Sequence, residues 1–71
     1  MLNYDEVMKK IGSNLKKERV FKNYTQEQLA DLAHVHRNYI SLIERGQQNL
    51  TMKKIIDLAN ILETPLEKII L

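Results

Sequence analysis

The stretch VHRNYISLIERG, residues 35–46, combines two kinds of helical face. Val35, Ile40 and Ile43 have the spacing of one apolar stripe, which predicts a helix packed against a core. A second face carries side chains that can meet a partner: Arg37, Asn38, Ser41, Leu42 and Arg45. Any surface helix needs a polar face, so the rest of the sequence must show whether this one binds something.

The length and composition predict one small domain, residues 1–71. The chain is 44% hydrophobic and 28% charged, which is typical of a folded globular protein. It contains no cysteine, so disulfides and thiolate metal sites are excluded. The opening residues, MLNYDEVMKK, lack the apolar region of a signal peptide, and no apolar run approaches the roughly 20 residues of a membrane span. We expect a cytoplasmic protein, bacterial or phage-encoded, with no membrane partner.

Positive charge is concentrated around the same stretch. The whole chain has a formal net charge of +2 at pH 7. Residues 34–54 contain four basic side chains and a single acidic one, Glu44, for a net charge of +3, and the remainder carries −1. A basic patch on a nearly neutral body is typical of a phosphate-binding surface, although a solvated basic face has the same composition.

Helical periodicity accounts for nearly the whole chain and predicts five helices in an all-α fold. The first covers about residues 5–22, with Val7, Ile11 and Leu15 on one face. The second runs to residue 33 and begins at Thr25, which forms a capping-box pattern with Gln28. The apolar positions of this second helix are Leu29, Ala30, Leu32 and Ala33.

The remaining helices are marked by their ends. The third covers about residues 36–45, after a turn near His34, and Gly46 is a natural residue to follow its last turn. Thr51 caps a fourth helix over residues 52–62, and Pro65 suits the first position of a short fifth helix. The fourth helix is expected to bury Ile55, Leu58, Ala59 and Leu62.

Few residues separate the second and third helices, which is typical of a helix-turn-helix, here about residues 25–45. The segment TQEQLADLAHVHRNYISLIERG resembles the helix-turn-helix of Cro/C1-type (XRE family) DNA-binding domains, and RNYISLIERGQQNLT is most similar to the controller proteins of restriction–modification systems. The resemblance covers about residues 11–70 and implies a compact five-helix, lambda-repressor-like fold. It also implies that the third helix enters the major groove of DNA.

The resemblance implies base contacts from the third helix and the following loop. Arg37 can donate two hydrogen bonds to a guanine, and Asn38 can pair with an adenine or with the sugar-phosphate backbone. Leu42 can meet a thymine methyl group or be covered by the neighbouring loop. The expected base contacts are Arg37, Asn38, Ser41, Leu42 and Gln48.

A second set of residues is expected to contact DNA phosphates. Gln26 opens the second helix, where free N–H groups attract anions, although a solvated first-turn residue fits equally well. Thr25 can cap its helix or contact a phosphate, and Tyr39 can pack its ring with or without a phosphate on its hydroxyl. The expected phosphate contacts are Thr25, Gln26, His36, Tyr39, Arg45, Gln47, Asn49, Thr51 and Lys53.

Arg19 and Glu44 are expected to have a structural role. Glu44 lies near the buried side of its helix, where an unpaired carboxylate is costly. Arg19 continues the apolar stripe of the first helix, and the resemblance implies an ion pair between the two that joins the first helix to the third.

His34 and His36 raise the question of a metal site. They are two residues apart, which does not place their side chains on one helical face, and no acidic residue or cysteine adjoins them. We therefore expect no metal and no other cofactor. His34 also stands where the family often has glycine, and a left-handed backbone there strains histidine more than glycine.

The C-terminal segment, about residues 61–71, is too apolar for an ordinary surface end. Part of it must cover the core, and part is expected to pair with a second copy across a two-fold axis. The alternative is a monomer whose tail folds back. The expected dimer interface consists of Leu62, Leu66, Ile69, Ile70 and Leu71.

Three classes of function compete for this sequence. An enzyme is not expected, because no nucleophile–base pair, carboxylate pair or glycine-rich loop is present. An antitoxin-like protein-interaction module uses the same scaffold. We expect a transcriptional regulator that binds a palindromic operator in double-stranded DNA as a homodimer, without a small-molecule ligand. The resemblance implies the controller of a restriction–modification system, with a phage-type repressor as the alternative and RNA polymerase as a further candidate partner.

Overall fold

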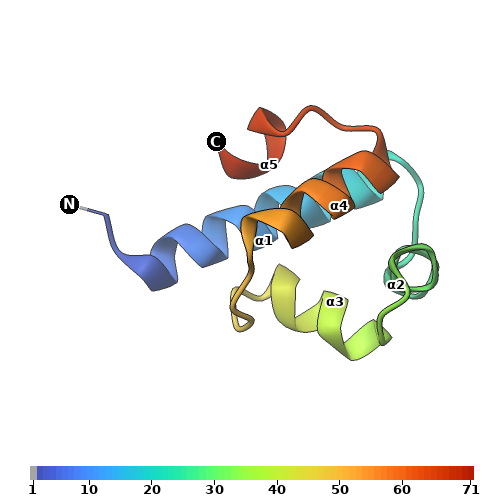
Figure 1. Cartoon of the computed structure of the whole chain (residues 1–71), viewed down its shortest axis with the longest axis horizontal. Coiled ribbons are helices and arrows are strands. Elements are labelled where there is room, and N and C mark those ends of the chain that lie inside the picture. The colour runs from blue at the N-terminus through green and yellow to red at the C-terminus, as the bar shows by residue number, and fades with distance from the viewer. Residues whose placement is uncertain (1) are drawn as a thin grey trace.

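The computed structural model describes residues 2–71, and this part of the chain folds into five helices. They are α1 (Tyr4–Phe21), α2 (Gln26–Ala33), α3 (Arg37–Glu44), α4 (Met52–Leu62) and α5 (Glu67–Ile70). These residues contain no strand, which confirms the all-α prediction. The long helix α1 packs against α3 and α5, which lie on different sides of it, and α2 packs against both α3 and α4 (Figure 1).

Side-chain caps define where the helices begin. Asn3 accepts a hydrogen bond from the N–H of Glu6 at the start of α1, at 3.2 Å. The capping box predicted for α2 is confirmed, because the N–H of Gln28 donates to Oγ1 of Thr25 at 3.0 Å and the N–H of Thr25 donates to Oε1 of Gln28 at 2.8 Å. Thr51 caps α4, as predicted, because its Oγ1 accepts a hydrogen bond from the N–H of Lys54 at 3.2 Å. Each cap satisfies an N–H group that the helix itself leaves free.

One hydrophobic core joins the five helices. The stripes predicted for α1, α3 and α4 contribute to it, and so does the apolar end of the chain. Leu32 is an exception, because the structure leaves its side chain 49% exposed on α2. Val35 packs against the core from the turn before α3, not from the helix. The buried hydrophobic residues are Met8, Ile11, Leu15, Leu29, Ala30, Ile40, Ile43, Ile55, Leu58, Ala59, Leu62 and Ile69.

The fifth helix begins later than predicted. Pro65 was expected at its first position, but α5 starts at Glu67. The carbonyl of Pro65 accepts a hydrogen bond from the N–H of Lys68 at 3.0 Å, so the proline lies in the turn that leads into the helix. The buried hydroxyl of Thr64 donates to the carbonyl of Leu62 at 3.3 Å and holds the chain close to the end of α4. With the chain held there, the helical turn starts after the proline.

Gly12 allows the backbones of α1 and α3 to touch. A Cβ atom at this position would overlap the carbonyl oxygen of Ile43 and lie 3.0 Å from the carbonyl carbon of Glu44. Only a glycine lets α3 approach so closely without displacing its backbone. A glycine inside a long helix is unfavourable by itself, so its presence at this position is a sequence signal of a close helix contact.

Gly46 ends α3 as predicted. Its φ is +73°, in the left-handed region. Its N–H donates to the carbonyl of Ile43 at 3.0 Å, and the N–H of Gln47 donates to the carbonyl of Leu42 at 2.9 Å. These bonds satisfy carbonyls that the helix end leaves open.

His34 ends α2 in the same left-handed region, with φ 58° and ψ 41°. Because glycine adopts this conformation without a Cβ penalty, we expect His34→Gly to raise the free energy of unfolding by about 0.5–1 kcal/mol. Urea denaturation measures the change. The matched control is His36→Gly, which removes a capping side chain and is expected to lower stability. A loss of stability in His34→Gly would contradict the assigned strain.

Candidate nucleic-acid interface

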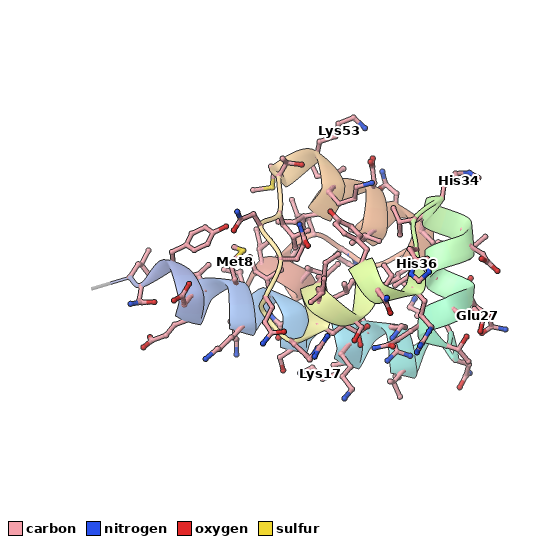
Figure 2. All side chains as sticks on the ribbon, turned by 90° about the horizontal axis from the view of Figure 1, so that it is seen from below. Met8, Lys17, Glu27, His34, His36 and Lys53 are labelled. Carbon is pink, nitrogen blue, oxygen red and sulfur yellow. The ribbon has the colours of Figure 1, made fainter. Side chains whose placement is uncertain are left out.

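Helix α3 is positioned by its buried face. Ile40 and Ile43 are fully buried, and α3 packs on both α2 and α1. The opposite face therefore points outward. Arg37 and Asn38 at its start are exposed, and Ser41 and Leu42, one turn later, are half-buried. Figure 2 views the molecule from this side, with His36 at the beginning of α3. The four expected base-contacting residues of the third helix thus lie on its accessible side.

Three of the residues expected at phosphates are N-caps. Thr25, His36 and Thr51 begin α2, α3 and α4, and each side chain accepts a hydrogen bond from its own helix. For His36 the acceptor is Nδ1, which receives the N–H of Asn38 at 3.0 Å. This bond fixes the start of the helix that carries Arg37 and Asn38. The capping role of Thr25, one of its two predicted alternatives, is therefore present.

An ion pair holds α1 to α3, as the resemblance implied. Nε of Arg19 donates to Oε2 of Glu44 at 2.7 Å, and Nη2 donates to Oε1 at 3.1 Å. The two side chains are 10% and 3% exposed. Nη1 of Arg19 also donates to the carbonyl of Tyr24, just before α2, at 2.7 Å. Arg19 therefore links α1 both to α3 and to the residue that precedes the cap of α2.

Gln26 belongs to the same network. Its Nε2 donates to Oε1 of Glu44 at 3.0 Å, and its side chain is half-buried. Gln26 is therefore a partly solvated first-turn residue that also has a structural contact. The reason is that the buried carboxylate has more acceptor positions than Arg19 fills. This bond uses one of the two hydrogens of the Gln26 side-chain amide.

The loop between α3 and α4 carries further expected contacts. Gln47 and Asn49 are exposed, and Gln48 is half-buried with its Nε2 at 3.5 Å from the carbonyl oxygen of Asn49. Oδ1 of Asn49 accepts a hydrogen bond from the hydroxyl of Tyr4 at 2.8 Å. Tyr4 was not among the predicted site residues, because nothing in its local pattern connects it to a loop 45 residues away.

Three expected phosphate contacts have local partners. Arg45 is exposed, and its Nε donates to the carbonyl of Ser41 at 3.3 Å. Lys53 pairs with Asp57 at 3.1 Å, a surface pair that contributes little and leaves the ammonium accessible. The ring of Tyr39 packs against the core, and Nζ of Lys54 lies 6.0 Å from its centroid. Lys54 adds a positive charge that the predicted site did not include.

The two histidines are separated in space as well as in sequence. His34 lines a hollow against α4, whereas His36 lines another against α2. Within residues 2–71 no cluster of three or more His, Asp or Glu side chains has a geometry suitable for a metal ion.

The expected dimer residues fall into two groups. Leu62 and Ile69 are each 1% exposed in the core of the single chain, so they are not available to a partner, and this part of the prediction is wrong. Leu62 lies on the buried face of α4, as the stripe of that helix predicted. Ile69 is buried where α5 packs on α1, and the side-chain amide of Asn14 donates to its carbonyl there at 2.9 Å. Leu66 and Ile70 are half-buried, and Leu71 is 82% exposed.

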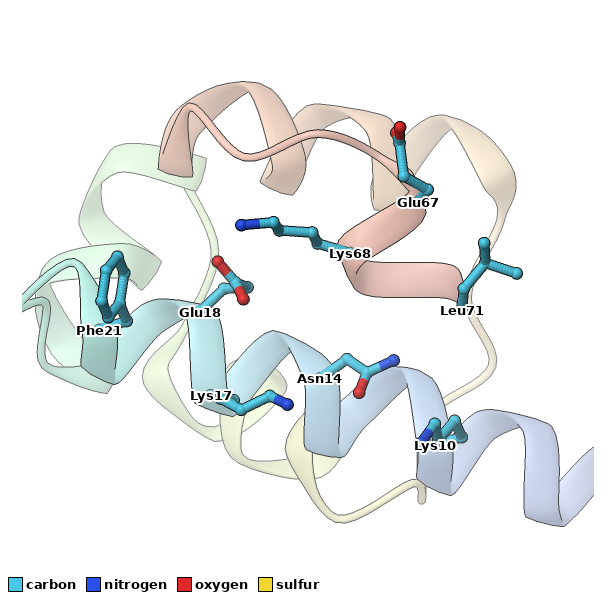
Figure 3. Close-up of a pocket in the computed structure, with 8 residues that line it drawn as sticks. All are labelled: Lys10, Asn14, Lys17, Glu18, Phe21, Glu67, Lys68 and Leu71. Carbon is cyan, nitrogen blue, oxygen red and sulfur yellow. The ribbon is translucent and has the colours of Figure 1, made fainter.

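Two hollows adjoin α5. The one in Figure 3 lies between α1 and α5 and mixes three lysines and two glutamates with Phe21, Asn14 and Leu71. Next to it, a more apolar hollow contains Leu2, Val7, Ile70 and Leu71. Across residues 2–71, no helix combines the length and the apolar character needed to cross a bilayer.

The fold and the exposed second helix of the pair define a helix-turn-helix domain of the Cro/C1 type. The helix-turn-helix family HTH_3 matches residues 15–69, and the chain belongs to this family. This finding confirms the family resemblance and the predicted five-helix fold.

Several relatives are restriction–modification controller proteins. Control protein C.SmaI of Serratia marcescens is 37% identical over 60 residues, which cover 84% of this chain and 71% of that protein. The crystal structure of the controller protein C.AhdI from Aeromonas hydrophila superposes with a TM-score of 0.81 at 34% identity, over 87% of this chain and 94% of that one. The clp gene regulator ClgR from C. glutamicum shares the fold, with a TM-score of 0.87 at 22% identity over 90% of this chain and 82% of that one. The chain is a helix-turn-helix regulator homologous to controller proteins.

Proposed function

We propose that this protein is a sequence-specific transcriptional regulator, the controller of a restriction–modification system, that acts in the bacterial cytoplasm. It binds a palindromic operator in double-stranded DNA as a homodimer and carries out no catalytic step. The observation that supports this most directly is α3, whose inner face is fully buried while Arg37 and Asn38 at its start stand free. The homology to named controller proteins supports the biological role.

In this proposal α3 reads the major groove. Arg37 donates to the O6 and N7 of a guanine, and Asn38 pairs with an adenine or with the backbone. Ser41 and Leu42, one turn further on, meet the next bases, with Leu42 against a thymine methyl group. Gln48 reaches the groove from the loop. This arrangement requires a rigid α3, which the His36 cap and the contact at Gly12 support.

Phosphate contacts position the domain on the duplex. The expected residues lie at the starts of α2, α3 and α4, on α3 itself and along the loop between α3 and α4. Helix N-termini and loop amides are suited to phosphate oxygens. The expected phosphate contacts are Thr25, Gln26, His36, Tyr39, Arg45, Gln47, Asn49, Thr51 and Lys53. Lys54, near the ring of Tyr39, adds a positive charge to this surface.

The dimer forms through the end of the chain, about residues 61–71. With Leu62 and Ile69 buried in each subunit, the contact rests on Leu66, Ile70 and Leu71. Leu2 and Val7, in the apolar hollow beside α5, extend this surface. A two-fold axis here places two copies of α3 on successive turns of DNA, roughly 34 Å apart, which matches a palindromic site.

Selection from a random DNA library with the purified protein tests the proposal. We expect a palindromic consensus, bound as a dimer in sedimentation experiments, with an affinity that falls steeply as salt rises because phosphate contacts release counterions. If no consensus emerges and the protein instead binds a protein partner with weak salt dependence, the interaction-module alternative is correct.

Arg37→Ala is expected to weaken binding to the selected operator about 5- to 150-fold, because a bidentate contact with a base contributes about 1–3 kcal/mol. Binding to non-specific DNA should change much less, and discrimination at one base pair should be lost. Fluorescence anisotropy titrations on both DNAs measure the difference. The matched control is Lys17→Ala, which removes the same charge from the hollow between α1 and α5. Equal losses in both variants would mean that Arg37 acts only through charge.

A further inference from the structure

The N-terminal half of α1 supports the loop between α3 and α4 at two points. The hydroxyl of Tyr4, in the first turn of α1, donates to Oδ1 of Asn49 at 2.8 Å. One turn further along, the backbone of Lys9 lies against Gly46, since a Cβ at Gly46 would come within 2.8 Å of Cα of Lys9. The loop is therefore held by a helix that has no predicted DNA contact of its own.

We propose that Tyr4 is a positioning residue for DNA binding, which orients the side-chain amide of Asn49 toward a phosphate. The inference rests on the proposed function. A side-chain amide has a carbonyl that only accepts hydrogen bonds and an NH₂ group that only donates them. A phosphate oxygen accepts, so only the NH₂ group of Asn49 can bind it. In the structure the hydroxyl of Tyr4 donates to the carbonyl oxygen of Asn49, which leaves the NH₂ group for a phosphate.

Without the tyrosine hydroxyl, the amide of Asn49 can rotate by half a turn about its last side-chain bond. The carbonyl would then face the phosphate, and two oxygens would repel each other. Asn49 is also bound through its backbone carbonyl, which accepts a hydrogen bond from Nε2 of Gln48 at 3.5 Å. Tyr4 thus stabilises the loop conformation that the phosphate and groove contacts require.

Tyr4→Phe removes only the hydroxyl, and it is expected to weaken DNA binding about three- to tenfold, the range of one hydrogen bond. The loss should be equal on the selected operator and on non-specific DNA, since a phosphate contact carries no sequence information. The thermal midpoint should stay within about 2 °C, because the hydroxyl is exposed. The matched control is Tyr24→Phe, whose ring packs against the core and which should leave the affinity unchanged.

A double-mutant cycle with Asn49→Ala separates positioning from direct contact. If Tyr4 acts through Asn49, Tyr4→Phe should have no further effect on affinity in the Asn49→Ala background. Additive losses would mean that Tyr4 contacts DNA by itself, and they would overturn the positioning role. Wild-type affinity in Tyr4→Phe would also overturn it while leaving the regulator proposal intact. Failure of the wild-type protein to bind any selected DNA would refute the proposed function itself.

Discussion

Replacing Glu44 with alanine is expected to lower the free energy of unfolding by about 3–5 kcal/mol, because it leaves the buried charge of Arg19 unpaired. The carboxylate receives two hydrogen bonds from Arg19 and one from Gln26, at 2.7–3.1 Å. Its side chain is 3% exposed, so water cannot replace these bonds. A domain of this size has on the order of 4–10 kcal/mol of stability, so the variant should lose about a third of it or more and its thermal midpoint should fall clearly.

Thermal and urea unfolding followed by circular dichroism measure this loss. Glu67→Ala is the matched control, because it removes an exposed carboxylate from α5 and should change stability by less than about 0.5 kcal/mol. The double variant Arg19→Met with Glu44→Met strands no charge and should be clearly more stable than Glu44→Ala. An unchanged midpoint in Glu44→Ala would show that the pair does not hold α1 to α3.

Gly12→Ala is the second substitution with a large expected effect, a loss of about 3 kcal/mol of stability. Helix propensity alone predicts the opposite sign, since alanine is favoured over glycine by about 1 kcal/mol inside a helix. The added methyl group, however, would overlap the carbonyl oxygen of Ile43, which is part of the backbone of α3 and cannot rotate away. The steric term therefore exceeds the propensity term, and α1 and α3 must separate.

The same unfolding measurements apply to this variant. Ser13→Ala, at the next and exposed position of α1, provides the control and should be slightly stabilising. A Gly12→Ala protein as stable as the wild type would mean that α1 and α3 can move apart at no cost. Operator affinity adds a second readout, because a shifted α3 no longer presents Arg37 and Asn38 in the same place.

Much of the fold was predictable because its signals are local. A capping box, a C-terminal glycine and an apolar stripe each lie within a few turns of one helix, so Thr25, Gly46 and the face of Ile40 and Ile43 could be assigned from sequence. The same holds for the outward face of α3, which is what remains when the buried stripe is removed. The pairing of Arg19 with Glu44, in contrast, came from the resemblance to a family and not from spacing.

The sequence by itself thus determined the five helices, the caps of α2 and α4, the end of α3 and the side of α3 that faces outward. Only the tertiary structure decided that Ile69 is buried within one chain, that Gln26 binds Glu44, and that Tyr4 reaches Asn49. An apolar or polar pattern indicates which residues of a helix face the core, but it does not indicate which residue of another helix each one contacts. That depends on how closely the helices approach and where they cross, and here the approach of α1 to α3 depends on the absence of one side chain at Gly12.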